Sequence, residues 1–139
     1  MTSTAIFWPM IAHVALVYFV YALMSRRRRA AIAAGKAKTR QFRENLQEPE
    51  ESLFVRNNLN NQFELPTLFY PACIALYMTG AATLVPVVIA WVFVASRWAH
   101  TAIHVTSNRI RYRRPMWIVG YFAVGALWFW LALHLLGLV

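Results

Sequence analysis

The stretch LPTLFYPACIALYMTGAATLVPVVIAWVFVAS, residues 65–96, carries no charged side chain over its 32 positions. Thr79 and Gly80 interrupt the apolar pattern near its middle. A helix needs about 20 predominantly apolar residues to cross the ~30 Å hydrocarbon core of a bilayer, so this stretch supplies two short crossings around a tight turn. The sequence therefore predicts a helical hairpin inside a membrane.

Two further uncharged runs lie on either side of this hairpin, at residues 4–24 and 115–139, and each is long enough for one crossing. In the first run the positive charges follow the apolar residues instead of preceding them, so we expect a retained helix and not a cleaved signal peptide. We predict an all-α integral membrane protein, a four-helix bundle forming one domain over residues 1–139. Its predicted helices span about 4–28, 52–80, 82–108 and 115–138.

Basic residues are concentrated between the apolar runs. Of the 14 Lys and Arg residues, nine lie between the first two predicted helices: Arg26, Arg27, Arg28, Arg29, Lys36, Lys38, Arg40, Arg43 and Arg56. Four more, Arg109, Arg111, Arg113 and Arg114, lie between the last two. Because cytoplasmic loops collect Lys and Arg, we expect a multi-pass protein with both basic loops in the cytoplasm and both termini on the other side.

The formal net charge of +9 could indicate a nucleic-acid partner. Its confinement to two loops beside apolar runs indicates membrane topology instead, with contact to anionic lipid headgroups. The predicted partner is thus the lipid bilayer, and no nucleic acid is expected.

Two charged residues are predicted to lie within the membrane-spanning hairpin. Glu64 precedes Gly80 by sixteen residues, and Arg97 follows Ala81 by sixteen. At 1.5 Å rise per residue both lie about 24 Å from the turn, just inside the cytoplasmic boundary. A charge at membrane depth costs about 3 kcal/mol, and such groups usually pair inside the bundle. We therefore expect an ion pair between Glu64 and Arg97.

The same register places Asn61 level with His100, and Asn57 level with His104. Residues 57, 61 and 64 share one helix face, and residues 97, 100, 104, 108 and 111 share another. We expect two polar stripes that face each other and open to the cytoplasm. Because residues 82–94 are apolar apart from Thr83, no continuous polar path crosses the membrane, which disfavours a transporter or channel.

These stripes could simply hold two helices together, as Asn and His do in membranes. A ligand site is favoured because, with Arg111, Arg113 and Arg114 just beyond, hydrogen-bond donors exceed acidic partners, which suits a bound anion. His100 and His104 have the spacing of metal ligands. However, Arg97 on the same face would repel a cation, so no metal is predicted. His13 and His134, alone in apolar runs, are interpreted as structural.

At these residues the sequence resembles the MAPEG family, the membrane-associated proteins of eicosanoid and glutathione metabolism. One family motif is Arg-Ala-x-x-Asn-x-x-Glu followed by Pro, and here the stretch reads NNLNNQFELP, residues 57–66. The second motif is Arg, then His or Tyr three residues on, then an aromatic residue four further on, then a basic segment. It corresponds to Arg97, His100, His104 and residues 108–113. The residues of the first motif are most similar to those of the bacterial branch of the family.

The resemblance implies a homotrimer with reduced glutathione, a co-substrate, bound between subunits near the cytoplasmic face. It places Asn57, Asn61, Glu64, Arg97, His100 and His104 in the glutathione site. Arg111 or Arg113 would be the catalytic stabiliser of the thiolate, and a residue within 26–29 would approach from the adjacent subunit. If the chain is bacterial, the resemblance implies the inner membrane.

The implied activity is that of a glutathione-dependent transferase or peroxidase acting on a lipophilic electrophile. The first Arg of the family motif is Asn57 here, and the aromatic residue of the second motif is His104. The alternative is therefore a non-catalytic lipid-binding or scaffold protein of the same fold. The sequence leaves open whether the chain is an enzyme and which electrophile it would use.

Overall fold

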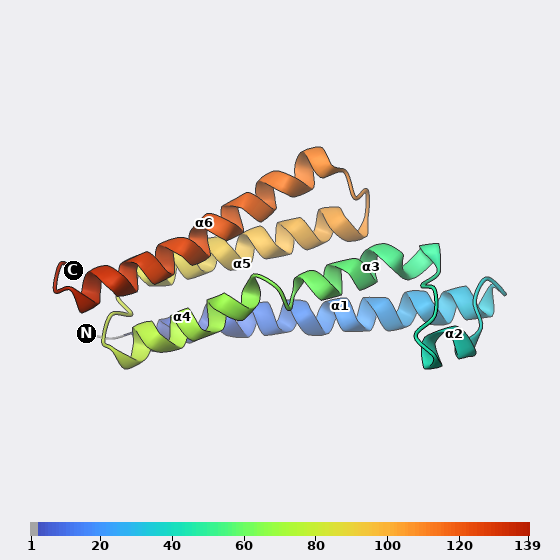
Figure 1. Ribbon diagram of the computed structural model, residues 1–139, viewed down its shortest axis with the longest axis horizontal. Helices are drawn as coiled ribbons and strands as arrows, with labels where there is room; N and C mark the ends of the chain where they lie inside the picture. The colour runs from blue at the N-terminus through green and yellow to red at the C-terminus, as the bar shows by residue number, and fades with distance from the viewer. Residues whose placement is uncertain (1–2) are drawn as a thin grey trace.

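The computed structural model describes residues 3–139, and within them the regular elements are all helical. In chain order they are a 3₁₀ helix η1 (Thr4–Ile6) and the α-helices α1 (Phe7–Ala33), α2 (Thr39–Arg43), α3 (Glu50–Asn61), α4 (Pro66–Met78), α5 (Leu84–Val105) and α6 (Ile110–Leu135). Figure 1 shows that α3 and α4 follow one another back along α1, and that the two termini lie at the end opposite α2.

Three of the predicted crossings are confirmed as long apolar helices. Thr4–Ala33, Leu84–Val105 and Ile110–Leu135 are each long and apolar enough to cross a membrane. The first helix continues past residue 28 to Ala33, and the third is slightly shorter than predicted. The fourth begins at Ile110, with Pro115 inside it and not at its start, so part of the predicted basic loop is helical.

The predicted continuous helix over 52–80 is wrong, because residues 62–65 interrupt it between α3 and α4. Pro66 has no N–H to donate, and in a continuous helix its ring would clash with the main-chain carbonyl four residues earlier, that of Gln62. The main chain closes the end of α3 with tighter turns, in which Gln62 N bonds to Leu59 O and Phe63 N to Asn60 O, each at 3.0 Å. Pro66 then starts α4, a position that proline tolerates well.

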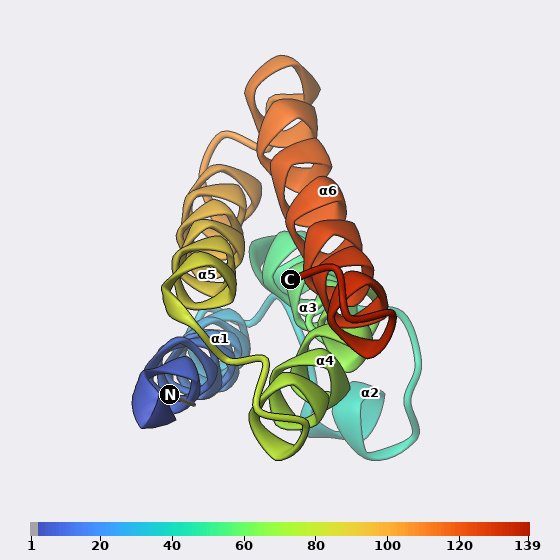
Figure 2. The same ribbon diagram turned by 90° about the vertical axis from the view of Figure 1, so that its left-hand side faces the viewer.

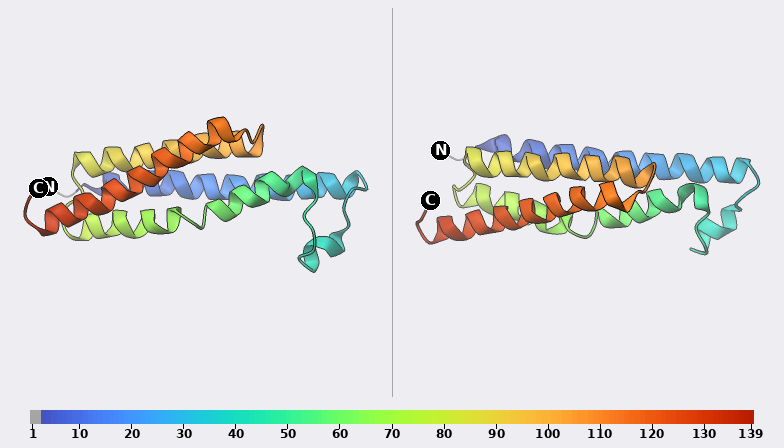
Figure 3. Two further views of the ribbon diagram at one scale, coloured as in Figure 1. Left: turned by 45° about the horizontal axis from the view of Figure 1, so that its top comes forward. Right: turned by 90° about the horizontal axis from the view of Figure 1, so that it is seen from above.

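Viewed along the helices, α1, α5, α6 and the α3–α4 pair surround a common centre (Figure 2). Figure 3 shows that α1 and α3 extend beyond the turn between α5 and α6. The main apolar core lies toward the termini, where α4, α5 and α6 meet. Its centre is the Phe69 ring stacked on the Phe93 ring, with centroids 4.3 Å apart. This core fixes how α4 packs against its neighbours.

The loop that follows α1 is fastened to that helix by Arg28. Its guanidinium donates two hydrogen bonds to the Glu48 carboxylate at 2.8 and 2.7 Å, and it lies over the Phe42 ring. Burial disfavours the charged carboxylate, but the hydrogen bonds from Arg28 and Ser52 outweigh it and lower the pKa of Glu48. The basic segment is thus an ordered part of the fold.

Candidate functional site

Arg97 is the largest fully buried side chain in the described chain, with an exposed fraction of 0%. Its Nη2 donates to the main-chain oxygen of Asn61 at 3.3 Å, where α3 ends. Carbonyls at a helix C-terminus carry partial negative charge, so a guanidinium there is favourable. Within residues 3–139, its Nε and Nη1 have no hydrogen-bond partner. The site therefore contains a buried cation with two unused donors.

The predicted ion pair between Glu64 and Arg97 does not form. Glu64 is exposed in the interruption between α3 and α4, and no ion pair in residues 3–139 joins it to Arg97, although its negative charge still acts on Arg97 at longer range. A continuous helix would have kept Glu64 on the face of Asn57 and Asn61, but the break turns this position outward. The end of α3 takes the place of the carboxylate as the partner of Arg97.

A buried polar network joins α3 to α5. Asn58 Oδ1 accepts hydrogen bonds from Gln62 Nε2 at 3.0 Å and from Thr101 Oγ1 at 3.2 Å. The side-chain nitrogens of Asn58 and Asn61 lie 3.3 and 3.5 Å from His104 Nδ1. Residues 58–62 therefore do lie opposite residues 97–104, with His104 bonded to both asparagines.

Three buried residues of this network, Asn58, Gln62 and Thr101, are not among the predicted site residues. The predicted polar face of the second helix passed through Asn57, whereas the buried face is displaced by one residue. The apolar pair Val55 and Leu59 marks that face, because both are buried and Asn58 and Gln62 share their helical spacing. This apolar periodicity was the signal that could have identified the two residues.

His13, interpreted from the sequence as structural, is fully buried and belongs to this same network. Its Nε2 lies 3.2 Å from Gln62 Oε1, and its Nδ1 lies 2.6 Å from the Tyr70 hydroxyl. The imidazole thus connects α1 to the interrupted segment and to α4.

An open cavity of about 290 Å³ lies beside this network, between the end of α3, α5 and the start of α6. Its lining residues are Asn61, His100, Ile110, Arg113, Arg114 and Trp117. His100 is 2% exposed, and its Nδ1 has no hydrogen-bond partner in the described part of the chain. We call this the cationic pocket, because two arginines line it and no acidic residue does.

The cationic pocket gathers some of the predicted site residues and leaves others outside. Asn61, His100 and Arg113 line it, and Arg113 is oriented by a hydrogen bond from its Nη1 to Asn108 Oδ1. Arg97 and His104 lie behind this wall, in contact with Asn61. Of the remaining predicted residues, Asn57 is half-buried, Glu64 and Arg111 are exposed, and none of the three lines the pocket.

Two of the four consecutive arginines that follow the apolar part of α1 bind other groups of the same chain. Arg27 Nη2 donates to Val105 O at 2.8 Å, at the end of α5, and Arg28 pairs with Glu48. Arg26 and Arg29 are exposed. If one of the four reaches a neighbouring molecule, the structure favours one of these two.

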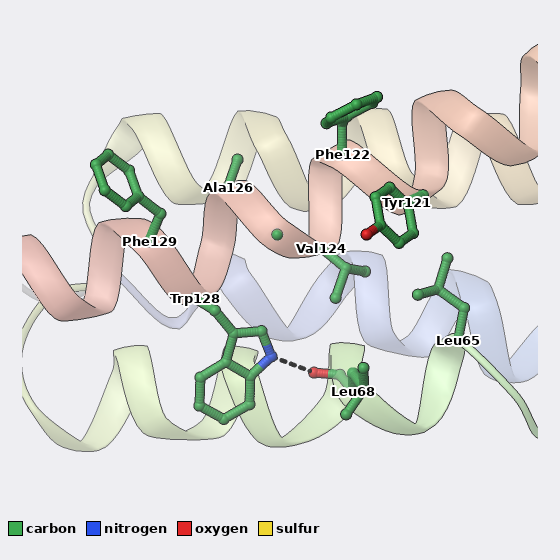
Figure 4. Close-up of a pocket in the computed structure, with 9 residues that line it drawn as sticks. Leu65, Leu68, Tyr121, Phe122, Val124, Ala126, Trp128 and Phe129 are labelled. Carbon is green, nitrogen blue, oxygen red and sulfur yellow. Dashed lines mark hydrogen bonds between the residues drawn. The ribbon is translucent and has the colours of Figure 1, made fainter.

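A larger groove of about 580 Å³ runs between α4 and α6 and is lined mainly by apolar side chains (Figure 4). Trp128 Nε1 donates to Leu68 O at 3.1 Å across it. Trp117 of the cationic pocket stacks on Tyr121 of the groove, with centroids 5.5 Å apart. The two cavities are therefore neighbours along α6.

No group of three or more His, Cys, Asp or Glu side chains within residues 3–139 could hold a metal ion. The described site offers mainly hydrogen-bond donors and positive charge, which is the chemistry of an anion-binding site.

Three long apolar helices and a buried polar site near one end define a helical membrane protein. The model of the MAPEG family matches residues 5–133, and the chain belongs to this family. A comparison with curated proteins gives no match, and a comparison with solved structures gives none.

Proposed function

We propose that this chain is a membrane-embedded glutathione-dependent transferase or peroxidase that acts on a lipophilic electrophile. Membership of the MAPEG family and the chemistry of the cationic pocket support this proposal. Reduced glutathione, the proposed co-substrate, carries two carboxylates and a thiol, so it matches a pocket rich in N–H donors and guanidinium groups.

The observation that carries the proposal is the buried guanidinium of Arg97, two of whose nitrogen atoms have no partner in residues 3–139. A buried charge without a counterion is strongly disfavoured unless a bound group compensates it. Asn61, which receives a hydrogen bond from Arg97, lines the cationic pocket. An anionic ligand in the pocket would add negative charge close to Arg97, which forms no ion pair within residues 3–139.

Arg113 is proposed to stabilise the thiolate, because it lines the pocket and Arg111 does not. A free thiol has a pKa of about 8.5 and is mostly protonated at neutral pH. A neighbouring guanidinium favours the anion and so raises the fraction of the reactive nucleophile. Asn61, His100 and the buried Arg97 would hold the rest of the tripeptide.

We further propose a homotrimer in which Arg26 or Arg29 approaches the pocket of the adjacent subunit, since both are exposed. In the proposed orientation, the end bearing α2 and the turn between α5 and α6 faces the cytoplasm, and both termini face the other side. The positive charge at that end supports this orientation. In a bacterium the membrane would be the inner membrane, and the lipophilic substrate would reach the groove from the bilayer.

One observation favours a second candidate, a non-catalytic lipid-binding or scaffold protein. The apolar groove has about twice the volume of the cationic pocket, at about 580 against 290 Å³. A protein that only holds lipid would need the groove and not the thiol chemistry.

Melting of the purified protein, with millimolar reduced or oxidised glutathione, tests the proposal. We expect stabilisation by the reduced form, and measurable conjugation of glutathione to a chloro-dinitrobenzene. Arg113→Gln should abolish conjugation, while Arg111→Gln, the same change on the same helix outside the pocket, should retain it. Loss only in Arg111→Gln would transfer the role to that residue. Absence of both stabilisation and conjugation in the wild-type protein would reject the enzyme and favour the lipid-binding alternative.

A further inference from the structure

A chain of hydrogen bonds links Tyr70 on α4 to His104 on α5 through the interior of the protein. From Tyr70 it passes to His13 on α1, then to Gln62, then to Asn58 on α3, and ends at His104. His13, Asn58, Gln62 and His104 are all at most 3% exposed. Side chains buried this deeply are not hydrated in bulk, so each donor in the chain must meet an acceptor.

The direction of this chain is fixed where Gln62 meets Asn58. Gln62 Nε2 lies 3.4 Å from the main-chain oxygen of Asn58 and 3.0 Å from its Oδ1. A main-chain oxygen can only accept, so Gln62 must turn its NH₂ group toward Asn58 and its Oε1 toward His13. His13 therefore carries its proton on Nε2 and accepts the Tyr70 hydroxyl proton at Nδ1.

The same logic assigns the proton of His104. Asn58 Oδ1 is occupied by donors from Gln62 and Thr101, so the Asn58 NH₂ group faces His104 Nδ1. The Asn61 NH₂ group approaches the same nitrogen. A ring nitrogen that accepts these bonds carries no proton, so the imidazole is neutral and its proton is on Nε2.

The Nε2 of His104 makes no hydrogen bond with the described part of the chain, and its ring lies beside the cationic pocket. Its centroid is 5.5 Å from that of His100, and its Nδ1 is 3.5 Å from the Asn61 side chain. We propose that Asn58 and Gln62 are positioning residues that hold His104 in the Nε2–H tautomer, so that it presents one fixed N–H donor to an anionic ligand. The ligand's identity as glutathione rests on the proposed function, whereas the tautomer does not.

Reversal of the tautomer would turn a lone pair toward the ligand in place of a donor. A hydrogen bond to a charged group contributes more than one between neutral groups, and its loss weakens binding by roughly tenfold or more. Asn58→Asp should place a proton on Nδ1, because a carboxylate of the same shape can only accept, and its negative charge beside the site should also oppose an anionic ligand. Gln62→Glu should act through Asn58, which must then turn its NH₂ group away from His104.

The test is nitrogen NMR of the protein labelled with ¹⁵N-histidine, with the His104 signals assigned by their loss in His104→Gln. In the wild-type protein we expect a protonated Nε2 and an unprotonated Nδ1. Asn58→Asp and Gln62→Glu should each protonate Nδ1, and each should weaken glutathione binding. Asn60→Asp is the matched control, since Asn60 is exposed on the same helix, and it should change neither quantity.

Two results would overturn the proposal: a wild-type His104 with its proton on Nδ1, or unchanged ring nitrogens in a folded Asn58→Asp or Gln62→Glu protein. The wild-type spectrum can overturn the proposal even if both variants fail to fold. If the wild-type tautomer is as expected but glutathione does not bind, the proposed function fails and the positioning role stands.

Discussion

The helices α3 and α4 follow one another along the same side of the molecule but bury opposite kinds of side chain. α4 buries Phe69, Ala72, Cys73 and Leu76, and these pack against apolar residues of α5 and α6. The buried residues of α3 include Asn58, and Gln62 follows directly after its end. One helix is therefore held by apolar packing and the other partly by directed hydrogen bonds.

This difference predicts that the two helices contribute to different properties, α4 to the stability of the fold and α3 to ligand binding. The apolar core is packed from residues of this chain alone, because each buried methyl or ring finds neighbours at van der Waals distance. The polar half is incomplete, since Arg97 and His100 retain buried nitrogens without partners in residues 3–139. Substitutions at the α4 end should therefore change stability most, and substitutions at the α3 end should change ligand binding most.

The largest expected effect is that of Phe69→Ala in the apolar half. Phe69 is fully buried and stacks on Phe93. Truncation of a buried phenylalanine leaves a cavity and typically destabilises by about 3 kcal/mol or more. Unfolding in a denaturing-detergent titration measures the loss. Phe129→Ala, at a position that is 65% exposed, is the control and should change stability little. Equal losses at both positions would show that the apolar core is not where stability resides.

Unlike Phe69→Ala, Arg97→Met should weaken ligand binding and leave the stability of the fold nearly unchanged. It removes a buried cation that forms no ion pair with a carboxylate in residues 3–139, so we expect little loss of stability. Glutathione binding should weaken by roughly tenfold to a hundredfold, the range for loss of a hydrogen bond to a charged group. Calorimetric titration measures the affinity. Arg109→Met removes the same charge at an exposed position and should change affinity much less. Similar weakening in both variants would assign the effect to overall charge and not to contact.

The comparison also separates what the sequence could predict from what it could not. Residues 65–96 were recognisable as a hairpin because long uncharged runs have few other uses. The register followed from the position of Gly80 and a constant rise per residue, and residues 58–62 do lie opposite residues 97–104. The level of a residue along the hairpin depends on the number of residues between it and the turn, so one short interruption changes it little.

The direction in which a residue points around the helix axis is much more sensitive to a local irregularity. The interruption before Pro66 redirects Glu64, and an error of one residue in the second helix rotates its predicted face by about 100°. Asn57 was predicted from its spacing to Asn61 and Glu64 and from the hairpin register, whereas the buried asparagine is Asn58, which lies on the face of Val55. Which of several adjacent amides points inward depends on packing with α1 and α5, which the local sequence does not contain.

Gly120→Ala should have a smaller effect, at the contact that joins α5 to α6. A Cβ atom at this position would lie 2.9 Å from Ser96 Oγ, so either the Ser96 hydroxyl must give up its hydrogen bond to Phe93 O or the helices must move apart. Overpacking of this kind typically costs about 1–3 kcal/mol. Ser96→Ala removes the obstructing oxygen, so the double variant should regain part of the loss in the same unfolding titration. No coupling between the two substitutions would show that the helices are not in this close contact.

The smallest expected effect concerns the loop that Arg28 fastens to α1, which leads into the start of α3. Because the folded-state pKa of Glu48 is lowered, its ionised form contributes stability that is fully present above about pH 5 and is lost as the pH falls through the folded-state pKa. Tryptic cleavage within residues 34–49 should therefore accelerate in Glu48→Gln, by an amount corresponding to about 1 kcal/mol. Glu44→Gln is the matched control, because Glu44 forms only surface ion pairs, which contribute little.

In a pH series down to 4, assayed by an acid-active protease, the wild-type loop should approach the cleavage rate of Glu48→Gln. A difference between them that does not narrow would show that the Glu48 carboxylate does not hold the loop.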